Sequence, residues 1–332
     1  MVAGKFWSVV AGVILLGTQV ATAEHIKLGL VKVANSGPTY IAQERGYFAA
    51  EGLDAELRFF DAAQPIAVAT VAGDVDLGIT GLTAGFYNLA GKGALRIIGA
   101  QSREEPGYHL IAYVASNRAF DAGLTSVAAL PGHSVAISQV GSTFHYSVGL
   151  LAAKLGFPLS GVKLVPLQAM SNMAAAVKGN QVDAALIPAT LAVPLASNGE
   201  GHLLGWVGDE TPWQVGAIFA GARTLAERRA VVARFIRAYR HGARDFYAAF
   251  LTKGADGRLR RGDGAADCLA IIAKYTGQDP DQISSGIPYV DPDARLLVDD
   301  IHHQVAWYQE QGLVDKTVDA ASLLDLSFLD AK

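Results

Sequence analysis

Hydrophobic and polar residues alternate along the first third of the chain in a way that predicts strands and helices in regular succession. Leu53, Ala55, Leu57 and Phe59 alternate with charged neighbours, which is the period-two pattern of a strand. Further strands are predicted over 26–33, 75–80, 95–100 and 109–114, with helices over 39–48, 65–72 and 82–90. This succession is typical of a mainly parallel sheet that is covered by helices on both faces.

The same succession starts again after Pro131. Strands are predicted over 134–138, 162–166, 182–187 and 202–207, and helices over 142–155, 169–178 and 191–197. The polar, glycine-containing segment 115–131 is predicted to hold a crossover between the two sets. Long helices are then predicted over 225–250, 265–275 and 294–311. Because three helices cannot bury their apolar faces alone, we expect them to pack on one of two α/β lobes.

The N-terminal segment has the pattern of a secretory signal peptide. Lys5 precedes a mostly apolar run over 6–16, and Ala21-Thr22-Ala23 offers small residues for cleavage before Glu24. The run is too short to span a bilayer as a mature helix. Since the only cysteine is Cys268, no lipid anchor is expected at the new N-terminus. We therefore predict a signal peptide at 1–23 and a soluble periplasmic protein; the alternative is a buried N-terminal helix.

Composition narrows the class of protein. The 332 residues suffice for about two domains, and 51% of them are hydrophobic, so large cores are available. A formal net charge of −4 argues against nucleic acid as a partner, because such a partner needs a basic face. A single cysteine excludes an intrachain disulfide. The fold is thus expected to depend on its cores alone.

Four turns that join a predicted strand to a predicted helix are rich in small and hydroxyl-bearing residues. They lie at 35–38, 80–83, 141–143 and 168–172. Ligands of open α/β sheets bind beyond the carboxyl ends of the strands, where the N–H groups of helix N-termini favour anions. Ordinary helix capping is the alternative explanation for each turn, since Ser, Thr and Asn are the preferred capping residues. Four such turns from two lobes favour a ligand site.

Several short motifs in a fixed order carry a resemblance to a known family. They are Ile26-Lys27-Leu28-Gly29 with Pro38-Thr39-Tyr40, Gln43 to Phe48 with Glu51-Gly52-Leu53, Gly73 to Gly78, Leu130 to Ala136, Gly179 to Ala184 and Trp307 to Val314. Taken together, these motifs resemble the nitrate/sulfonate/taurine class of periplasmic ABC-transporter solute-binding proteins, in the thiamine-pyrimidine-synthase-like superfamily.

The resemblance implies the type II periplasmic-binding fold, an α/β fold with two lobes, two crossover segments and a ligand cleft between the lobes. Lobe one is expected over 24–114 and 219–332, and lobe two over 115–218. Asp76 and Asp183 are expected to cap turns rather than bind ligand. The resemblance and the turns together give these candidate ligand-binding residues: Ser36, Pro38, Tyr40, Thr80, Gly81, Thr83, Arg103, Gly141, Ser142, Thr143, His145, Asn172, Thr190 and Trp213.

For three of these candidates, a structural role is an alternative to ligand binding. Arg103 could clamp an anion bidentately or pair with Glu104 or Glu105 on a solvated loop. His145 could face the cleft or serve as a capping or packing residue. Trp213 could form an aromatic wall or belong to the core.

One departure from the family pattern bears on the ligand. Many relatives have an aromatic or acidic residue where this chain has Pro188-Ala189-Thr190. The change removes an obvious carboxylate partner for an amine, so a zwitterion such as taurine is disfavoured.

The resemblance implies a binding protein of an ABC importer that captures a small organic anion and delivers it to the permease. The anion could be a sulfonate, a carboxylate or an aromatic acid, and a pyrimidine also remains open. Expected partners are the permease and ATPase subunits, the protein is expected to be a monomer, and no cofactor or metal is expected. His302 and His303 diverge on a helix, so they are interpreted as a surface pair.

An enzyme on the same fold is the alternative function, acting on a sulfinate or a thiamine-pyrimidine-type substrate. Relatives include a desulfinase with a catalytic cysteine in lobe one and a synthase that consumes its own histidine and lysine. Cys268 lies on a late predicted helix, away from the candidate turns. The sequence also has no H-E-x-x-H, P-loop or G-x-S-x-G motif.

Overall fold

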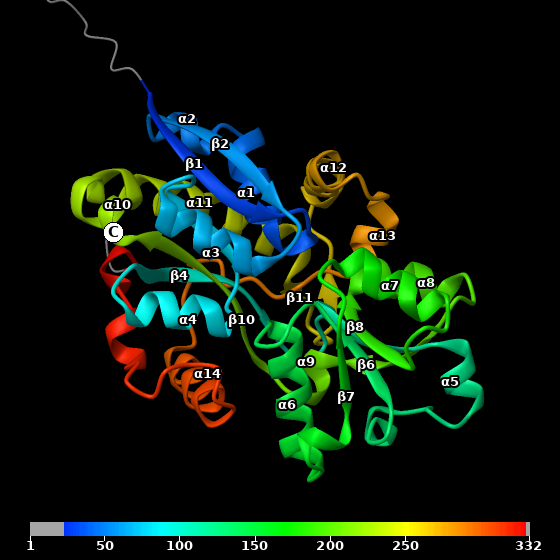
Figure 1. Cartoon of the computed structure of the whole chain (residues 1–332). Helices are drawn as coiled ribbons and strands as arrows, with labels where there is room; N and C mark the ends of the chain where they lie inside the picture. Colours follow the sequence, from blue (N-terminus) through cyan, green and yellow to red (C-terminus); the bar gives the residue numbers. More distant parts are fainter. Residues whose placement is uncertain (1–22, 330–332) are drawn as a thin grey trace, which may run out of the picture.

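The computed structural model describes residues 23–329, so residues 1–22 of the predicted signal peptide lie outside the described part. Two five-stranded sheets form the centres of two lobes (Figure 1). The first sheet has the order β2-β1-β3-β10-β4, with β1 at Glu24–Val31, β2 at Leu53–Phe60, β3 at Leu77–Gly81, β4 at Leu95–Glu104 and β10 at Trp213–Gly221. Strands β1, β2 and β3 are parallel, whereas β10 runs antiparallel between β3 and β4.

The second sheet repeats this plan. Its order is β7-β6-β8-β5-β9, with β5 at Ile111–Ala115, β6 at Ser134–Ile137, β7 at Lys163–Pro166, β8 at Ala184–Pro188 and β9 at His202–Trp206. Strand β6 is parallel to β7 and β8, and β5 is antiparallel to β8 and β9. The chain crosses between the sheets twice, from β4 to β5 and from β9 to β10. The first crossing therefore lies between Glu104 and Ile111, not in the segment 115–131 predicted for it, because β5 already belongs to the second sheet.

Helices follow the strands in both lobes, as the alternation predicts. The first group is α1 at Gly37–Glu44, α2 at Tyr47–Ala50, α3 at Ala63–Ala72 and α4 at Ala84–Gly91. The second group is α5 at Asn117–Asp121, α6 at Thr143–Leu155, α7 at Met170–Lys178, α8 at Ala189–Ser197 and α9 at Val207–Glu210. Among the described residues, no helix has the length and apolar character needed to cross a membrane.

The C-terminal third returns to the first sheet as a set of helices. They are α10 at Ala222–Glu227, α11 at Arg229–Phe250, α12 at Ala265–Thr276, α13 at Pro280–Ser285 and α14 at Val298–Glu310, with a small hairpin of β11 at Thr252–Lys253 and β12 at Leu259–Arg260. Helix α11 packs along α1, and α14 lies against α4 and β10. The helix predicted over 225–250 is broken at Arg228, and the strand β10 was not predicted at all.

Two aspartates join neighbouring strands within the sheets. One Asp76 carboxylate oxygen accepts a hydrogen bond from the Lys27 N–H at 2.8 Å, and the other pairs with Arg228 at 2.8 Å. Asp183 accepts hydrogen bonds from the N–H and hydroxyl of Ser134, at 2.9 and 2.8 Å. Both carboxylates thus hold backbone segments together.

The two lobes share a continuous apolar contact on one side of the molecule. Tyr146 of α6 is 1% exposed and packs against Trp213 and Tyr308, which belong to elements of the first lobe. The Tyr308 hydroxyl also donates to the Ser142 carbonyl at 3.1 Å, and the Ala84 N–H donates to the Gly141 carbonyl at 2.9 Å. The lobes are therefore in close contact in this structure.

The segment 286–297, here called the strap, runs along the outer edge of β4. The N–H groups of Ala100 and Arg103 donate to the carbonyls of Ala294 and Tyr289, at 2.8 and 3.2 Å. This pairing covers the open edge of a sheet that otherwise ends at β4. The helix predicted over 294–311 therefore begins only at Val298.

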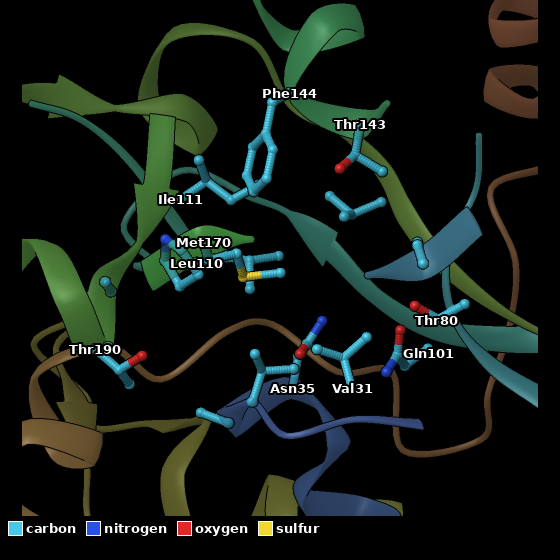
Figure 2. A pocket seen from close by; sticks show the side chains of 18 residues that line it. Val31, Asn35, Thr80, Gln101, Leu110, Ile111, Thr143, Phe144, Met170 and Thr190 are labelled. Carbon is cyan, nitrogen blue, oxygen red and sulfur yellow. The ribbon is translucent and has the colours of Figure 1, made fainter. Parts of the chain in front are cut away.

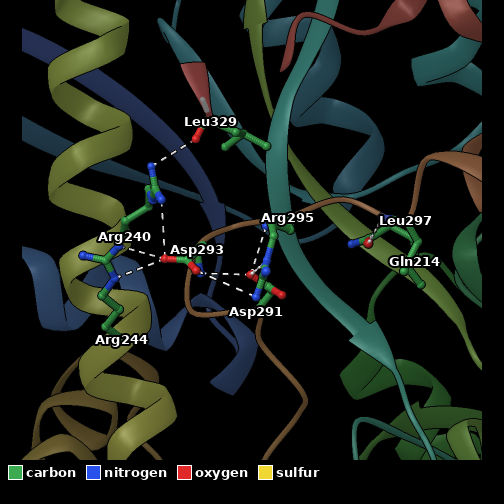
Figure 3. A network of polar contacts seen from close by, with 8 residues as sticks. All are labelled: Gln214, Arg240, Arg244, Asp291, Asp293, Arg295, Leu297 and Leu329. Carbon is green, nitrogen blue, oxygen red and sulfur yellow. Dashed lines mark hydrogen bonds and ion pairs between the residues drawn. The ribbon is translucent and has the colours of Figure 1, made fainter. Parts of the chain in front are cut away.

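Carboxylates anchor the strap to helix α11 (Figure 3). One oxygen of Asp293 accepts hydrogen bonds from Arg244 at 2.8 Å and from Arg240 at 3.4 Å. Asp291 accepts hydrogen bonds from the Asp293 and Arg295 N–H groups, which fixes the turn of the strap. The anchored strap begins at Gly286, which lies at the cavity described below.

Replacing Asp293 with Asn is expected to destabilise the fold in a pH-dependent way. The hydrogen bond from Arg244 is the main reason that the pKa of Asp293 lies below its usual range. The charged carboxylate therefore stabilises the folded state at neutral pH, and this contribution is lost as the pH falls through the lowered pKa. Urea unfolding should show a loss of up to about 1 kcal/mol at neutral pH, which shrinks progressively below about pH 4.

A matched control for this prediction is Asp256→Asn, which removes an exposed ion pair with Arg260 in the small hairpin. That change should leave the free energy of unfolding nearly unaltered. An equal loss for Asp293→Asn at neutral and strongly acidic pH would show that the ion pair does not contribute.

Candidate functional site

A cavity lies between the two sheets, where the carboxyl ends of their parallel strands face each other (Figure 2). Its walls surround about 630 Å³ of space, part of which is open to solvent. Both lobes supply its walls. The apolar lining includes Val31, Val33, Leu110, Ile111, Phe144 and Met170, and the polar lining consists of Asn35, Thr80, Gln101, Thr143 and Thr190.

The first residues of four helices point to this cavity. Ala63 begins α3, Thr143 begins α6, Met170 begins α7 and Ala189 begins α8, and each of them lines the cavity. Each helix follows the carboxyl end of a parallel strand, so the alternation of strands and helices itself brings these N-termini together. Their N–H groups and partial positive charges favour a negatively charged ligand.

Three of these helices begin without a side-chain cap. The N-cap residues of α3, α7 and α8 are Ala62, Ala169 and Pro188, which have no side-chain oxygen to accept from the first N–H groups. By contrast, the hydroxyls of Ser142 and Thr83 do cap α6 and α4. The uncapped N-termini leave backbone donors for a ligand at the cavity.

The cavity lining carries no ionisable side chain among the described residues. An anion inside would therefore be stabilised by backbone N–H groups and hydroxyls rather than by an arginine or lysine. The lining also holds no paired nucleophile and base of the kind that covalent catalysis requires. In the described part of the chain, no group of three or more His, Cys, Asp or Glu could hold a metal ion.

Gln101 forms part of the wall on the side of the first sheet. It lies on β4, and its side chain reaches across β10 at Gly216, where an added Cβ would meet the Gln101 Oε1 at 2.2 Å. Its Nε2 donates to the Ile79 carbonyl at 3.4 Å. Nearby, the Nδ2 of Asn35 donates to the Ser102 hydroxyl at 3.0 Å.

An outer chamber continues from the cavity toward solvent. It shares Thr190, Met170 and three other residues with the cavity and extends past Phe59 and Lys32. The Lys32 ammonium lies 5.0 Å from the centre of the Phe59 ring. A basic group thus stands in the outer chamber although none lines the inner cavity.

The structure places some of the predicted site residues together at the cavity. Those in its lining are Thr80, Gly81, Thr143 and Thr190. Ser142 and Thr83 border a smaller neighbouring hollow, where both act as helix caps. Gly141 lies next to them, with its carbonyl bonded to the Ala84 N–H.

The other predicted site residues lie outside the lining of the cavity. The hydroxyls of Ser36 and Tyr40 both donate to the Val31 carbonyl, at 2.9 and 3.2 Å. Pro38 is in the first turn of α1. Asn172 is exposed and donates to the Leu167 carbonyl at 3.0 Å.

Arg103, His145 and Trp213 are engaged in structural contacts. The Arg103 Nε donates to Glu105 at 2.8 Å, and its guanidinium lies 4.1 Å from the centre of the Tyr289 ring. The Nδ1 of His145 accepts from the Gly141 N–H at 3.0 Å, and burial lowers the pKa of its imidazole. Trp213 is 1% exposed and belongs to the apolar contact between the lobes.

Sequence reasoning missed Gln101 and Phe144 as lining residues. Asn35 and Met170 lie within the turns predicted at 35–38 and 168–172, but neither was chosen as a candidate. The search for turns rich in small and hydroxyl-bearing residues found helices with side-chain caps. In such helices the cap already accepts a hydrogen bond from one of the first backbone N–H groups.

The residues Ala62, Ala169 and Pro188, which lack a side-chain oxygen, occupy the N-cap positions of α3, α7 and α8. The sequence did not reveal this, because the predicted helices began at 65, 169 and 191, so these residues did not stand at the expected N-cap positions.

Comparison with known proteins gives a family and a set of structural neighbours. The sequence model described as NMT1/THI5 like matches residues 33–249. No curated protein matches the chain.

Solved structures show the same two-lobe fold. The alkanesulfonate-binding protein SsuA from Xanthomonas axonopodis pv. citri, bound to MOPS, is 21% identical with a TM-score of 0.71, over 91% of this chain and 98% of that one. The periplasmic nitrate-binding protein NrtA from Synechocystis PCC 6803 is 15% identical with a TM-score of 0.66, over 90% and 84%. A mutant of DSZB in complex with biphenyl-2-sulfinic acid is 13% identical with a TM-score of 0.58, over 93% and 98%.

Proposed function

The chain belongs to the NMT1/THI5-like family, and we propose that it is a periplasmic solute-binding protein of an ABC importer that captures a small organic anion. The ligand class includes sulfonates, carboxylates and aromatic acids. The loaded protein would deliver its ligand to the permease and ATPase subunits of the transporter. The signal peptide at 1–23 and a monomeric state are parts of the same proposal.

The convergence of helix N-termini on an uncharged cavity is the observation that carries this proposal. Four helices begin at the cavity, three of them without a side-chain cap. Such an arrangement leaves several N–H donors and a positive partial charge at one place, which suits an oxyanion. An alkanesulfonate-binding protein, a nitrate-binding protein and a DSZB mutant in complex with a sulfinic acid share the fold, which supports an anionic ligand.

The division into lobes belongs to the proposal as well. Lobe one would comprise 24–104 and 213–329, and lobe two 111–206. The boundaries expected after 114 and 218 shift to the two crossings, because β5 belongs to the second sheet and β10 to the first. The two crossings of the chain, from β4 to β5 and from β9 to β10, would serve as the hinge. The outer chamber with Lys32 would then be the side on which the lobes separate.

An enzyme on the same fold remains the alternative function, since DSZB shares the fold. Cys268, the only cysteine, is completely buried in α12 and does not line the cavity. Burial also raises the pKa of its thiol to about 11, so little thiolate is present at neutral pH. The cavity therefore suits reversible binding better than covalent chemistry.

Calorimetric titration of the purified protein tests the proposal. The protein is first unfolded and refolded to remove any carried-over ligand, and then titrated with sulfonates, aromatic carboxylates, nitrate, taurine and pyrimidines. We expect saturable binding of an organic anion, with the compound recovered unchanged. The Cys268→Ala variant should bind with the same affinity. Turnover of a compound that depends on Cys268 would support the enzyme instead, and no binding by any anion would contradict the proposal.

A further inference from the structure

Gln101 has a buried acceptor with no partner at the wall of the cavity. Its side chain is 1% exposed, and its Oε1 accepts no hydrogen bond within the described structure. The orientation of the carboxamide is fixed by its other end, because Nε2 donates to the Ile79 carbonyl and a carbonyl can only accept. The free group is therefore the oxygen.

A second free carboxamide oxygen lies on the same wall. Asn35 donates through Nδ2 to the hydroxyl of Ser102, the residue that follows Gln101 on β4, and its Oδ1 is buried without a partner. Both residues line the cavity. Buried polar groups are nearly always hydrogen-bonded, so an unpartnered acceptor at a ligand cavity indicates a group that the ligand satisfies.

The arrangement of the walls restricts how such a ligand lies. Figure 2 shows Gln101, Thr80 and Thr143 on one side of the cavity and Ile111 and Leu110 across from them. Asn35 lies between these sides, next to Val31. A ligand would thus meet most of the polar side chains along one edge, and along the other edge an apolar surface with the hydroxyl of Thr190 as its polar group.

We propose that the ligand carries an N–H or O–H donor in addition to its anionic group, and that the donor binds Gln101 Oε1. The inference rests on the proposed function and narrows its ligand class. The anionic group faces the N–H groups at the starts of the helices, which are donors, while the free carboxamide oxygens need a donor from the ligand. A simple anion such as nitrate, or an alkanesulfonate without a donor, leaves these oxygens unsatisfied. A site built to bind a donor discriminates strongly against analogues that lack it.

Pairs of compounds that differ only in the donor test this inference. The pairs are N-acetyltaurine and its analogue with a methylene in place of the amide N–H, para-hydroxybenzenesulfonate and para-toluenesulfonate, and para-hydroxybenzoate and para-toluate. Calorimetry with the wild-type protein should show at least about tenfold tighter binding of the donor-bearing member in at least one pair.

The variant Gln101→Met removes the acceptor while keeping the length of the side chain. We expect this variant to bind the donor-bearing compound more weakly than the wild type does, so that the two affinities within a pair differ by no more than about threefold. The melting temperature of the empty variant should change little, since the change removes the unpartnered oxygen together with only one long hydrogen bond, from Nε2 to the Ile79 carbonyl at 3.4 Å. Gln139→Met makes the same chemical change beside the smaller hollow, outside the cavity lining, and should leave the preference intact.

The outcomes separate the inference from the proposed function. Equal affinities within every pair, with anions still binding, would overturn the inference and leave the proposed function standing. Absence of binding by these compounds and by every anion of the wider panel would overturn both. If the Gln101→Met variant fails to fold, the comparison of the pairs on the wild-type protein decides alone.

Discussion

Replacing Thr143 with Asp should reduce the affinity for an anionic ligand by more than about 100-fold while leaving the protein folded. Thr143 is the first residue of α6 and lines the cavity, with 9% of its surface exposed. A carboxylate there would meet the ligand's charge at about 4 Å, where two like charges in a partly buried site repel by up to about 4 kcal/mol. The same carboxylate would interact favourably with the N-terminus of α6, so the free energy of unfolding should not fall.

Asn at position 143 is the matched control, because it has nearly the same shape as Asp and no charge. Thr143→Asn should change the affinity only a few-fold, and the difference between the two variants isolates the charge. Titration calorimetry gives the affinities and urea unfolding gives the stabilities. Similar affinities for both variants would show that the anion does not lie at the start of α6.

Replacing Gly149 with Ala should destabilise the protein, although the same change stabilises most helices. Alanine is favoured over glycine in a helix interior by about 1 kcal/mol. In this chain, however, a Cβ at Gly149 of α6 would lie 2.1 Å from a ring carbon of Trp307. The rings of His145 and Tyr146 both pack against the Trp307 ring, and the centre of each lies 5.2 Å from its centre, which limits its movement. We expect a net loss of about 1–3 kcal/mol from overpacking.

A double-mutant cycle with Trp307→Ala distinguishes this clash from a general defect of the helix. The smaller side chain at position 307 leaves room for the Cβ, so Gly149→Ala should cost much less in that background. The two changes should therefore be strongly non-additive in urea unfolding. A gain in stability from Gly149→Ala alone would mean that the lobes are not packed together at α6 and α14.

Local pattern was sufficient to predict most of the strands and helices before the C-terminal third. Strand β2 shows the alternation of Leu53 and Ala55 with polar residues, and the structure confirms it over Leu53–Phe60. Strand β10 was missed because it is buried throughout and so shows no alternation, and because Gln214 and Gly216 interrupt the apolar run by which buried strands such as β5 were found. Its antiparallel position between β3 and β4 depends on contacts between residues far apart in the sequence, which local pattern does not contain.

The strap shows a second limit of local pattern. The apolar residues Leu296 and Leu297 fit the helical pattern of the residues that follow, so the helix was predicted to begin as early as Ala294. In the structure, Ala294 has a φ of +58° and its carbonyl accepts a hydrogen bond from β4. These residues could form either a turn of helix or hydrogen bonds with the edge of β4, and tertiary contacts favour the pairing with β4.

The candidate site was only partly predictable for a related reason. Residue type correctly directed attention to the strand-to-helix turns, and four of the predicted residues line the cavity. Hydroxyl-bearing turns, however, include ordinary caps such as Ser142, whose side chain is already bonded to the His145 N–H. Gln101 lies inside a strand rather than in a turn, so a search limited to turns does not find it.

The absence of ionisable groups from the lining of the proposed anion site, within the described part of the chain, has a consequence for how binding would depend on pH. Binding sites built on histidine or carboxylates gain or lose charge as the pH changes. The cavity of this chain presents fixed backbone dipoles and neutral side chains, so its attraction for an anion stays constant for as long as the fold survives. Under the proposed function, any acid sensitivity of binding would come from the ligand itself: a sulfonate stays ionised at acidic pH, whereas a carboxylic acid loses its charge once it is protonated.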